Sequence, residues 1–118
     1  MRHHNTNRKF GRVRKQRKAL LRSLVISLVD HERIETTEAK AKELRPFIEK
    51  IITKSKKDSV STKRLLISKL CRGANSTVKK LIEMIAPKYK DREGGYTRIT
   101  KLAVRQGDAS PMAQIEFV

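Results

Sequence analysis

Residues 19–29 of this chain read ALLRSLVISLV, and eight of these eleven side chains are apolar. On a helix they surround nearly the whole cylinder, which is the pattern of a helix buried on most sides. Its main stripe consists of Leu21, Leu24, Val25 and Leu28. The stretch therefore predicts a largely buried helix.

The residues before this helix have the opposite character. Residues 1–22 contain nine Lys or Arg side chains, six of them Arg, and no Asp or Glu. Such a segment repels itself and buries too little apolar surface to offset the entropy of ordering, so we expect it to order against phosphate backbone. We divide the chain into a basic extension, residues 1–18, and a single globular domain, residues 19–118.

The junction between the two parts has two possible structures. Extending the apolar stripe backwards by threes and fours reaches Arg14, Arg17 and Lys18, so one helix face is apolar in one half and cationic in the other. Either the helix starts near Lys18, or its first turns project beyond the core. Positive charge at a helix N-terminus opposes the macrodipole, so these turns should fray in the free protein.

The chain after residue 30 predicts three more helices and then two strands. Tyr96–Val104 is rich in residues that favour strands, and Met112–Val118 alternates, with Ala113, Ile115 and Phe117 on one face. Helices first and strands last indicate an α+β fold, about four helices packed on a small sheet with a C-terminal β-hairpin. Before these strands we expect an edge strand at 32–36 and a helix that is capped by Thr36 or Thr37, is kinked or split by Pro46 and ends near Ser55. Two further helices follow: one runs through 65–70 and is stopped by Gly73, and the other is capped within 75–77 and is ended by Pro87.

Composition favours a polyanionic partner. The 118 residues include 29 Lys or Arg and 12 Asp or Glu, a formal net charge of +17. Trp is absent and aromatic residues make up 4%, which argues against recognition by stacking of unpaired bases. Contacts to phosphates and to the shape of a folded nucleic acid fit better.

Catalytic and metal-binding residues are not evident. His3, His4, His31 and the single cysteine, Cys71, lack the spacing of metal ligands, and Cys71 lies in an apolar run where we expect a core or half-buried residue rather than a reactive thiol. No run approaches the roughly 18 apolar residues of a membrane span. We therefore expect a cytoplasmic protein that is not an enzyme, with no cofactor, metal, small-molecule substrate, membrane association or homo-oligomer.

The candidate binding residues are the basic side chains of the extension and its junction with the helix. For Lys54, Lys56 and Lys57, a solvated face and a binding surface remain equally open. The candidates in this first group are Arg2, His3, His4, Arg8, Lys9, Arg12, Arg14, Lys15, Arg17, Lys18 and Arg22.

The sequence resembles a bacterial ribosomal family, that of the seventeenth protein of the large subunit. The resemblance covers almost the whole chain and rests on several short segments. These are Met1-Arg2-His3, residues 17–20, Ser27-Leu28-Val29 with His31-Glu32, Ile34, Thr36-Thr37, residues 40–45, residues 94–99, Gly107-Asp108 and residues 111–113.

The resemblance implies a structural protein that binds large-subunit ribosomal RNA beside other large-subunit proteins, near the exit of the nascent-chain tunnel. It also implies an α+β fold with a basic N-terminal extension. By the same resemblance, Tyr96, Thr97 and Arg98 form a second RNA-facing patch, to which Lys101 and Arg105 are added on charge alone. A DNA-compacting protein is the rival hypothesis, but the chain shows no clear helix-turn-helix spacing. An enzyme acting on RNA is weaker still.

Overall fold

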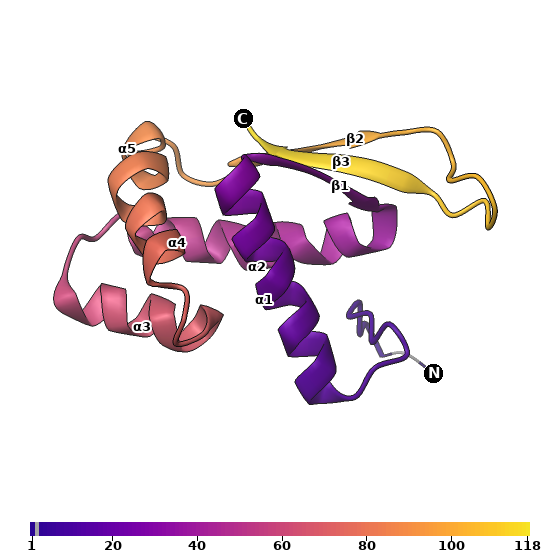
Figure 1. The fold of residues 1–118 in the computed structure, drawn as a ribbon, viewed down its shortest axis with the longest axis horizontal. Coiled ribbons are helices and arrows are strands. Elements are labelled where there is room, and N and C mark those ends of the chain that lie inside the picture. The colour runs from indigo at the N-terminus through magenta and orange to yellow at the C-terminus, as the bar shows by residue number, and fades with distance from the viewer. Residues whose placement is uncertain (2) are drawn as a thin grey trace.

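The computed structural model describes residue 1 and residues 3–118, and Arg2 lies outside the described residues. This part of the chain forms four helical segments and one three-stranded antiparallel sheet (Figure 1), which confirms the predicted α+β fold; α1 and α2 pack against the sheet, and the other helices pack against these two. The fourth helical segment is continuous from α4 through the π-helical η1 to α5. The elements are α1 (Arg14–His31), β1 (Arg33–Thr37), α2 (Glu38–Ser55), α3 (Val60–Leu70), α4 (Asn75–Lys80), η1 (Leu81–Ile85), α5 (Ala86–Lys88), β2 (Thr97–Lys101) and β3 (Met112–Phe117).

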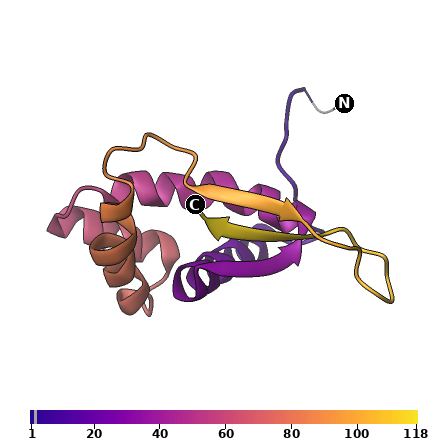
Figure 2. The same ribbon diagram turned by 90° about the horizontal axis from the view of Figure 1, so that it is seen from above.

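The sheet has the order β1-β3-β2, so the last strand lies in the middle and the predicted edge strand is confirmed at one side. In the register, Ile34 of β1 and Ile99 of β2 both lie opposite Ile115 of β3. The predicted alternation of β3 is also confirmed, because Ala113 and Ile115 are buried and Phe117 packs against the core. The loop between β2 and β3 extends past the helices (Figures 1 and 2).

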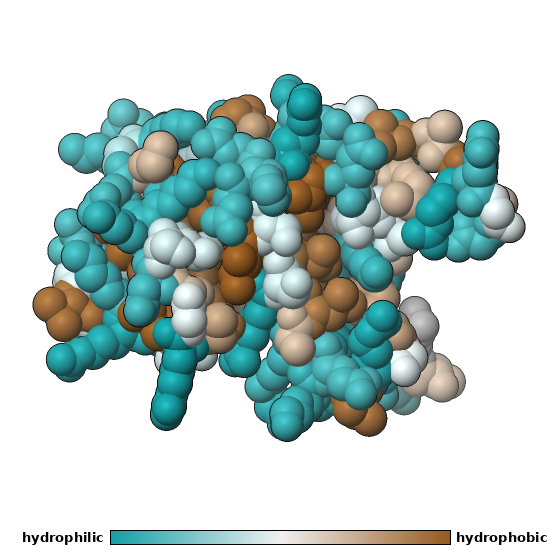
Figure 3. Space-filling view, in the orientation of Figure 1, coloured by the Kyte–Doolittle hydropathy of each residue, from teal (hydrophilic) through white to brown (hydrophobic). Residues whose placement is uncertain are grey.

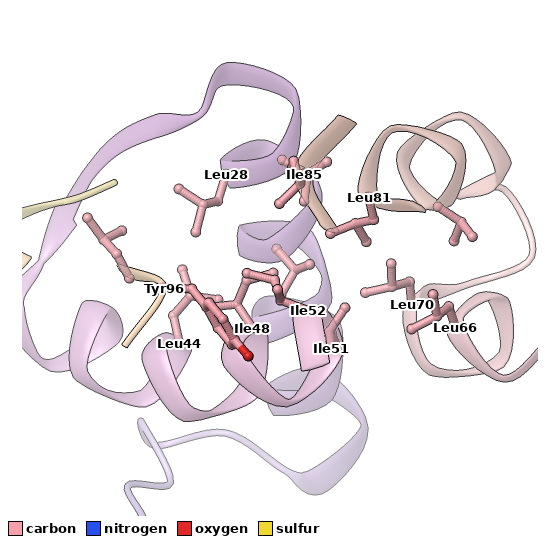
Figure 4. Close-up of a cluster of buried hydrophobic side chains, with 14 of the residues drawn as sticks. Leu28, Leu44, Ile48, Ile51, Ile52, Leu66, Leu70, Leu81, Ile85 and Tyr96 are labelled. Carbon is pink, nitrogen blue, oxygen red and sulfur yellow. The ribbon is translucent and has the colours of Figure 1, made fainter. Parts of the chain in front are cut away.

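The core lies between the sheet and α1 and α2 and continues to α3 and η1. Leu28 of α1, Ile48 of α2 and Ile85 of η1 are almost wholly buried in it (Figure 4). The helix predicted from residues 19–29 thus packs within this core along its second half.

Of the two structures predicted for the junction with the extension, the second is found: helix α1 begins at Arg14 and not near Lys18. Its first turns project beyond the core, where Arg14, Lys15 and Lys18 are exposed. At its other end, Glu32 adopts a left-handed conformation with φ 63° and donates its N–H to the carbonyl of Leu28 at 2.7 Å. This cap turns the chain directly into β1.

Helix α2 is a single helix, so Pro46 does not split it. Pro46 is exposed, and the backbone hydrogen bond that it cannot make is missing on the solvent side. Thr37 occupies the capping position but makes no side-chain cap. The N–H of Glu38 donates instead to the carbonyl of Pro111 at 3.0 Å, which joins the start of α2 to the entry of β3.

The ends of the later helices differ from the sequence predictions. Helix α3 stops at Leu70, three residues before Gly73, and Cys71 leaves it in an extended conformation. Cys71 is exposed, so the prediction of a core or half-buried cysteine is wrong; the change to extended backbone at the helix end accounts for the exposure.

The fourth helical segment begins after Ala74 without a side-chain cap and continues past Pro87 to Lys88. The ring of a proline clashes with the carbonyl four residues earlier, here that of Glu83, and the π turn of η1 widens the helix at that position. Strand β2 is also shorter than predicted, ending at Lys101 rather than Val104. No helix in the described residues is long and apolar enough to cross a membrane.

Candidate nucleic-acid interface

The described residues of the extension form a turn that brings their cations close to the start of α1. Phe10 and Gly11 both have positive φ, 55° and 61°, a conformation that glycine adopts without strain. The N–H of Arg12 donates to the carbonyl of Lys9 at 3.1 Å, and Arg17 Nη1 donates to the carbonyl of Arg12 at 3.1 Å. The first helical turns and the turn before them thus form one unit.

A second contact ties the extension to the body. Arg8 Nη1 lies 2.8 Å from Glu43 Oε1 of α2, although 35 positions separate the two residues. Arg8 is exposed and Glu43 is only partly so. The extension is therefore held to α2 at one defined point, and Figure 2 shows its N-terminal end standing out from the body on the α2 side.

The start of α1 attracts anions for two independent reasons. Its first turn contains no acidic residue and Val13 provides no side-chain cap, so the backbone N–H groups there remain open. The positive end of the helix dipole adds to the side-chain charges. Hydrophilic side chains cover this lower part of the molecule in Figure 3. We call these residues the N-terminal basic surface: Arg8, Lys9, Arg12, Arg14, Lys15, Arg17 and Lys18.

Of the other predicted residues in this region, His3 and His4 are exposed, and Arg2 lies outside the described residues. Arg22 differs from the rest. It is half-buried, and its Nε donates to the carbonyl of Lys69 at 2.8 Å, one of the last carbonyls of α3. Its first role is thus to satisfy the end of a neighbouring helix.

Two residues of the second predicted patch, Tyr96 and Thr97, are buried in the structure. The side chain of Tyr96 is 1% exposed and that of Thr97 is 8% exposed, so neither presents a surface to a partner. The hydroxyl of Tyr96 lies 3.2 Å from that of Thr53, and Thr97 Oγ1 donates to Glu49 Oε1 at 3.0 Å. The Thr97 bond connects β2 to α2, and Tyr96, the residue before β2, belongs to the core, so both side chains are turned inward in the structure.

Arg98 and Lys101 are exposed but point to opposite faces of the sheet, as their odd spacing in β2 requires. Both donating atoms of Arg98, Nε at 2.9 Å and Nη2 at 2.7 Å, bind Glu116 Oε1 on the outer face. Lys101 Nζ lies 3.6 Å from Glu38 Oε1 on the helix side. The two side chains therefore do not form one surface.

Arg105 lies in the loop between β2 and β3 and is also paired. Its guanidinium makes two hydrogen bonds to Asp108, of 3.1 and 2.6 Å. These bonds, with others from Ser110, hold the pKa of the Asp108 carboxyl well below its usual range. Arg105 therefore shapes this loop, and Asp108 partly neutralises its charge.

The structure also brings Lys54, whose role the sequence left open, near two cations that the sequence did not single out. Helix α2 packs against α3, and Lys50 and Lys54 of α2 are near enough to Lys69 of α3 to act on its charge. The spacing of four between Lys50 and Lys54 is visible in the sequence, whereas Lys69 belongs to another helix. Lys56 has a structural role instead: its Nζ lies 4.9 Å from the centre of the Tyr96 ring and donates to the carbonyl of Arg92. Among residues 1 and 3–118, no group of three or more His, Cys, Asp or Glu could hold a metal ion.

Comparisons with known proteins agree on one family. The sequence model described as "Ribosomal protein L17" matches residues 20–118. The chain is 53% identical to the large ribosomal subunit protein bL17 of Nautilia profundicola, over all of this chain and 98% of that one. It is 50% identical to the bL17 of Wolinella succinogenes over the full length of both. It is 48% identical to the bL17 of Sphingopyxis alaskensis, of which 84% is covered.

Proposed function

The chain belongs to the ribosomal protein L17 family, and from this premise we propose that its N-terminal basic surface binds large-subunit ribosomal RNA. The protein is a structural constituent of the large ribosomal subunit and, like its bacterial relatives, a component of the cytoplasmic ribosome. The family is structural rather than enzymatic. Our proposal adds which part of the molecule contacts the RNA.

The observation that carries the proposal is the concentration of unpaired cations at the start of α1. Arg14, Lys15 and Lys18 make no ion pair with any described residue, whereas Arg98, Lys101 and Arg105 each do. Unpaired, exposed cations are the ones that can exchange their counterions for phosphates. The open N–H groups of the first helical turn add directional donors for phosphate oxygens.

We further propose a division of labour along the chain. Residues 1–18 are the RNA-binding extension, and residues 19–118 are a body that holds it in place and contacts neighbouring large-subunit proteins. The resemblance noted for the whole sequence supports a position near the exit of the nascent-chain tunnel. Crosslinking from an exposed body residue to a stalled nascent chain tests that position.

The salt dependence of RNA binding tests the main proposal. If about eight phosphates are neutralised, log affinity should fall with log salt concentration at a slope of roughly −6 to −7. A slope near zero for the purified protein on large-subunit RNA contradicts the proposal. Equal affinity for random duplex DNA would favour the DNA-compacting alternative instead.

Deleting residues 1–12 tests the extension separately. The truncated chain keeps α1 from Arg14 onward and should remain folded, but we expect impaired incorporation into large subunits. A circular dichroism spectrum gives the control for folding. Normal incorporation of a folded, truncated chain would show that the extension is dispensable.

A further inference from the structure

Three lysines from two helices meet at one place on the surface. Lys50 and Lys54 lie one turn apart on α2, which packs against α3, and both are near enough to Lys69 of α3 to act on its charge. We call Lys50, Lys54 and Lys69 the lysine cluster. The proximity of Lys54 lowers the pKa of Lys69, and burial and Lys50 act in the same direction. Like charges brought together in this way oppose folding.

Among the described residues, the nearby carboxylates do not pair with these lysines. None of the three lysines forms an ion pair with any residue that the structure describes. The two carboxylates on this part of α2 have other partners, since Glu43 binds Arg8 and Glu49 accepts a hydrogen bond from Thr97. The free protein therefore carries a local excess of positive charge that a bound anion would relieve.

The lysine cluster is continuous with the N-terminal basic surface. Lys69 lines an open hollow of about 180 Å³ together with Lys18 and Arg22 of α1. Along α2, Glu43, Lys50 and Lys54 follow at intervals of seven and four, which places them on one helix face. Arg8 is bound at Glu43, so the extension and the cluster occupy the two ends of this face, about 16 Å apart along the helix.

We propose that the lysine cluster is a second phosphate-binding site, which holds the backbone of the same RNA that the N-terminal basic surface binds. This inference rests on the proposed function. An acidic protein surface fits less well, because lysine is depleted at protein–protein interfaces, and the continuity with the extension favours one extended polyanion. The site recognises phosphate and not base identity, since ammonium groups act as point charges without the fork of arginine.

The test compares two double variants of the full chain. Lys50→Gln with Lys54→Gln removes two charges from the lysine cluster. The control, Lys79→Gln with Lys88→Gln, removes the same charge from exposed positions on α4 and α5. Affinity for large-subunit RNA is measured between 50 and 200 mM salt, and each variant is also unfolded in urea.

We expect the cluster variant to lose two phosphate contacts. Its loss of affinity between 50 and 200 mM salt should be about tenfold smaller than that of the unmodified protein, because each contact contributes a slope of about −0.9. The control should retain the original slope. The urea midpoint of the cluster variant should rise, because like-charge repulsion is relieved, and a purely structural role would lower it.

Several results would overturn the inference. One is a cluster variant that binds RNA with the same slope as the control. Another is a cluster variant that keeps its RNA affinity but fails to enter large subunits, which would assign the lysines to a neighbouring protein. A shallow salt dependence of the unmodified protein would contradict the proposed function itself. A steep dependence that the cluster variant and the control share would contradict only the role of the lysine cluster.

Discussion

The guanidinium Nε of Arg22 donates a hydrogen bond of 2.8 Å to the carbonyl oxygen of Lys69, 47 positions further along the chain. This bond connects α1 to the last turn of α3, where helix carbonyls lack intrahelical partners. It also places α1 against the helix that carries one member of the lysine cluster. Arg22 therefore couples the core to the proposed RNA-binding face.

Replacing Arg22 with alanine should destabilise the protein. The change removes a charged donor from a partly buried carbonyl, which costs about 1–2 kcal/mol in the free energy of unfolding. Urea unfolding measures this loss. Lys15→Ala, at an exposed position of the same helix, should change stability by less than about 0.5 kcal/mol. Equal effects of the two substitutions would contradict the role given to Arg22.

Tyr96 is expected to matter for stability and not for RNA binding. Tyr96→Phe keeps the ring in the core and loses the hydroxyl contact with Thr53, for a cost of about 1 kcal/mol. Because Tyr96 is only 1% exposed, the affinity of the Tyr96→Phe protein for large-subunit RNA should equal that of the unmodified protein. Filter binding together with urea unfolding checks both statements. A clear fall in affinity without unfolding would restore Tyr96 as an RNA contact.

Glu38 should titrate below its usual range in the folded protein. The hydrogen bond from Lys42 lowers its pKa from 4.5 most strongly, and Lys101 acts in the same direction. Since the folded pKa lies below the unfolded one, the stabilisation is complete above about pH 4.5 and is lost as the pH falls through the folded pKa.

Carboxyl chemical shifts in an NMR titration measure this midpoint directly. Lys42→Met should raise it more than Lys101→Met, because Lys42 Nζ lies 2.8 Å from Glu38 Oε1 and Lys101 Nζ lies 3.6 Å from it. The reverse order would mean that Lys101 is the principal partner.

Cys71 should react readily with a thiol reagent in the folded protein. It is the single cysteine of the chain and its side chain is exposed at the end of α3. A disulfide-exchange dye should therefore titrate one thiol per chain without denaturant, at a rate close to that in urea. Protection that disappears only on unfolding would show that Cys71 is buried after all.

Local patterns were sufficient where neighbours in sequence decide the outcome. The apolar stripe from Leu21 to Leu28 predicted the buried half of α1, and the alternation of residues 112–118 predicted which face of β3 meets the helices. Both follow from the period of a helix or a strand, which is fixed by the backbone alone. The ends of elements were harder to predict, because the contacts that end them come from elsewhere, as Pro111 does for α2.

The sequence by itself determined the acid-free extension, its net charge and the switch from cationic to apolar along α1, because these are properties of adjacent residues. Only the tertiary structure decided which cations remain available to a partner. Packing turned Tyr96 and Thr97 inward and paired Arg98 with Glu116 of the neighbouring strand. It also brought Lys69 beside Lys50 and Lys54 from another helix. Burial and pairing depend on distances in space, and the spacing of these residues along the chain does not contain those distances.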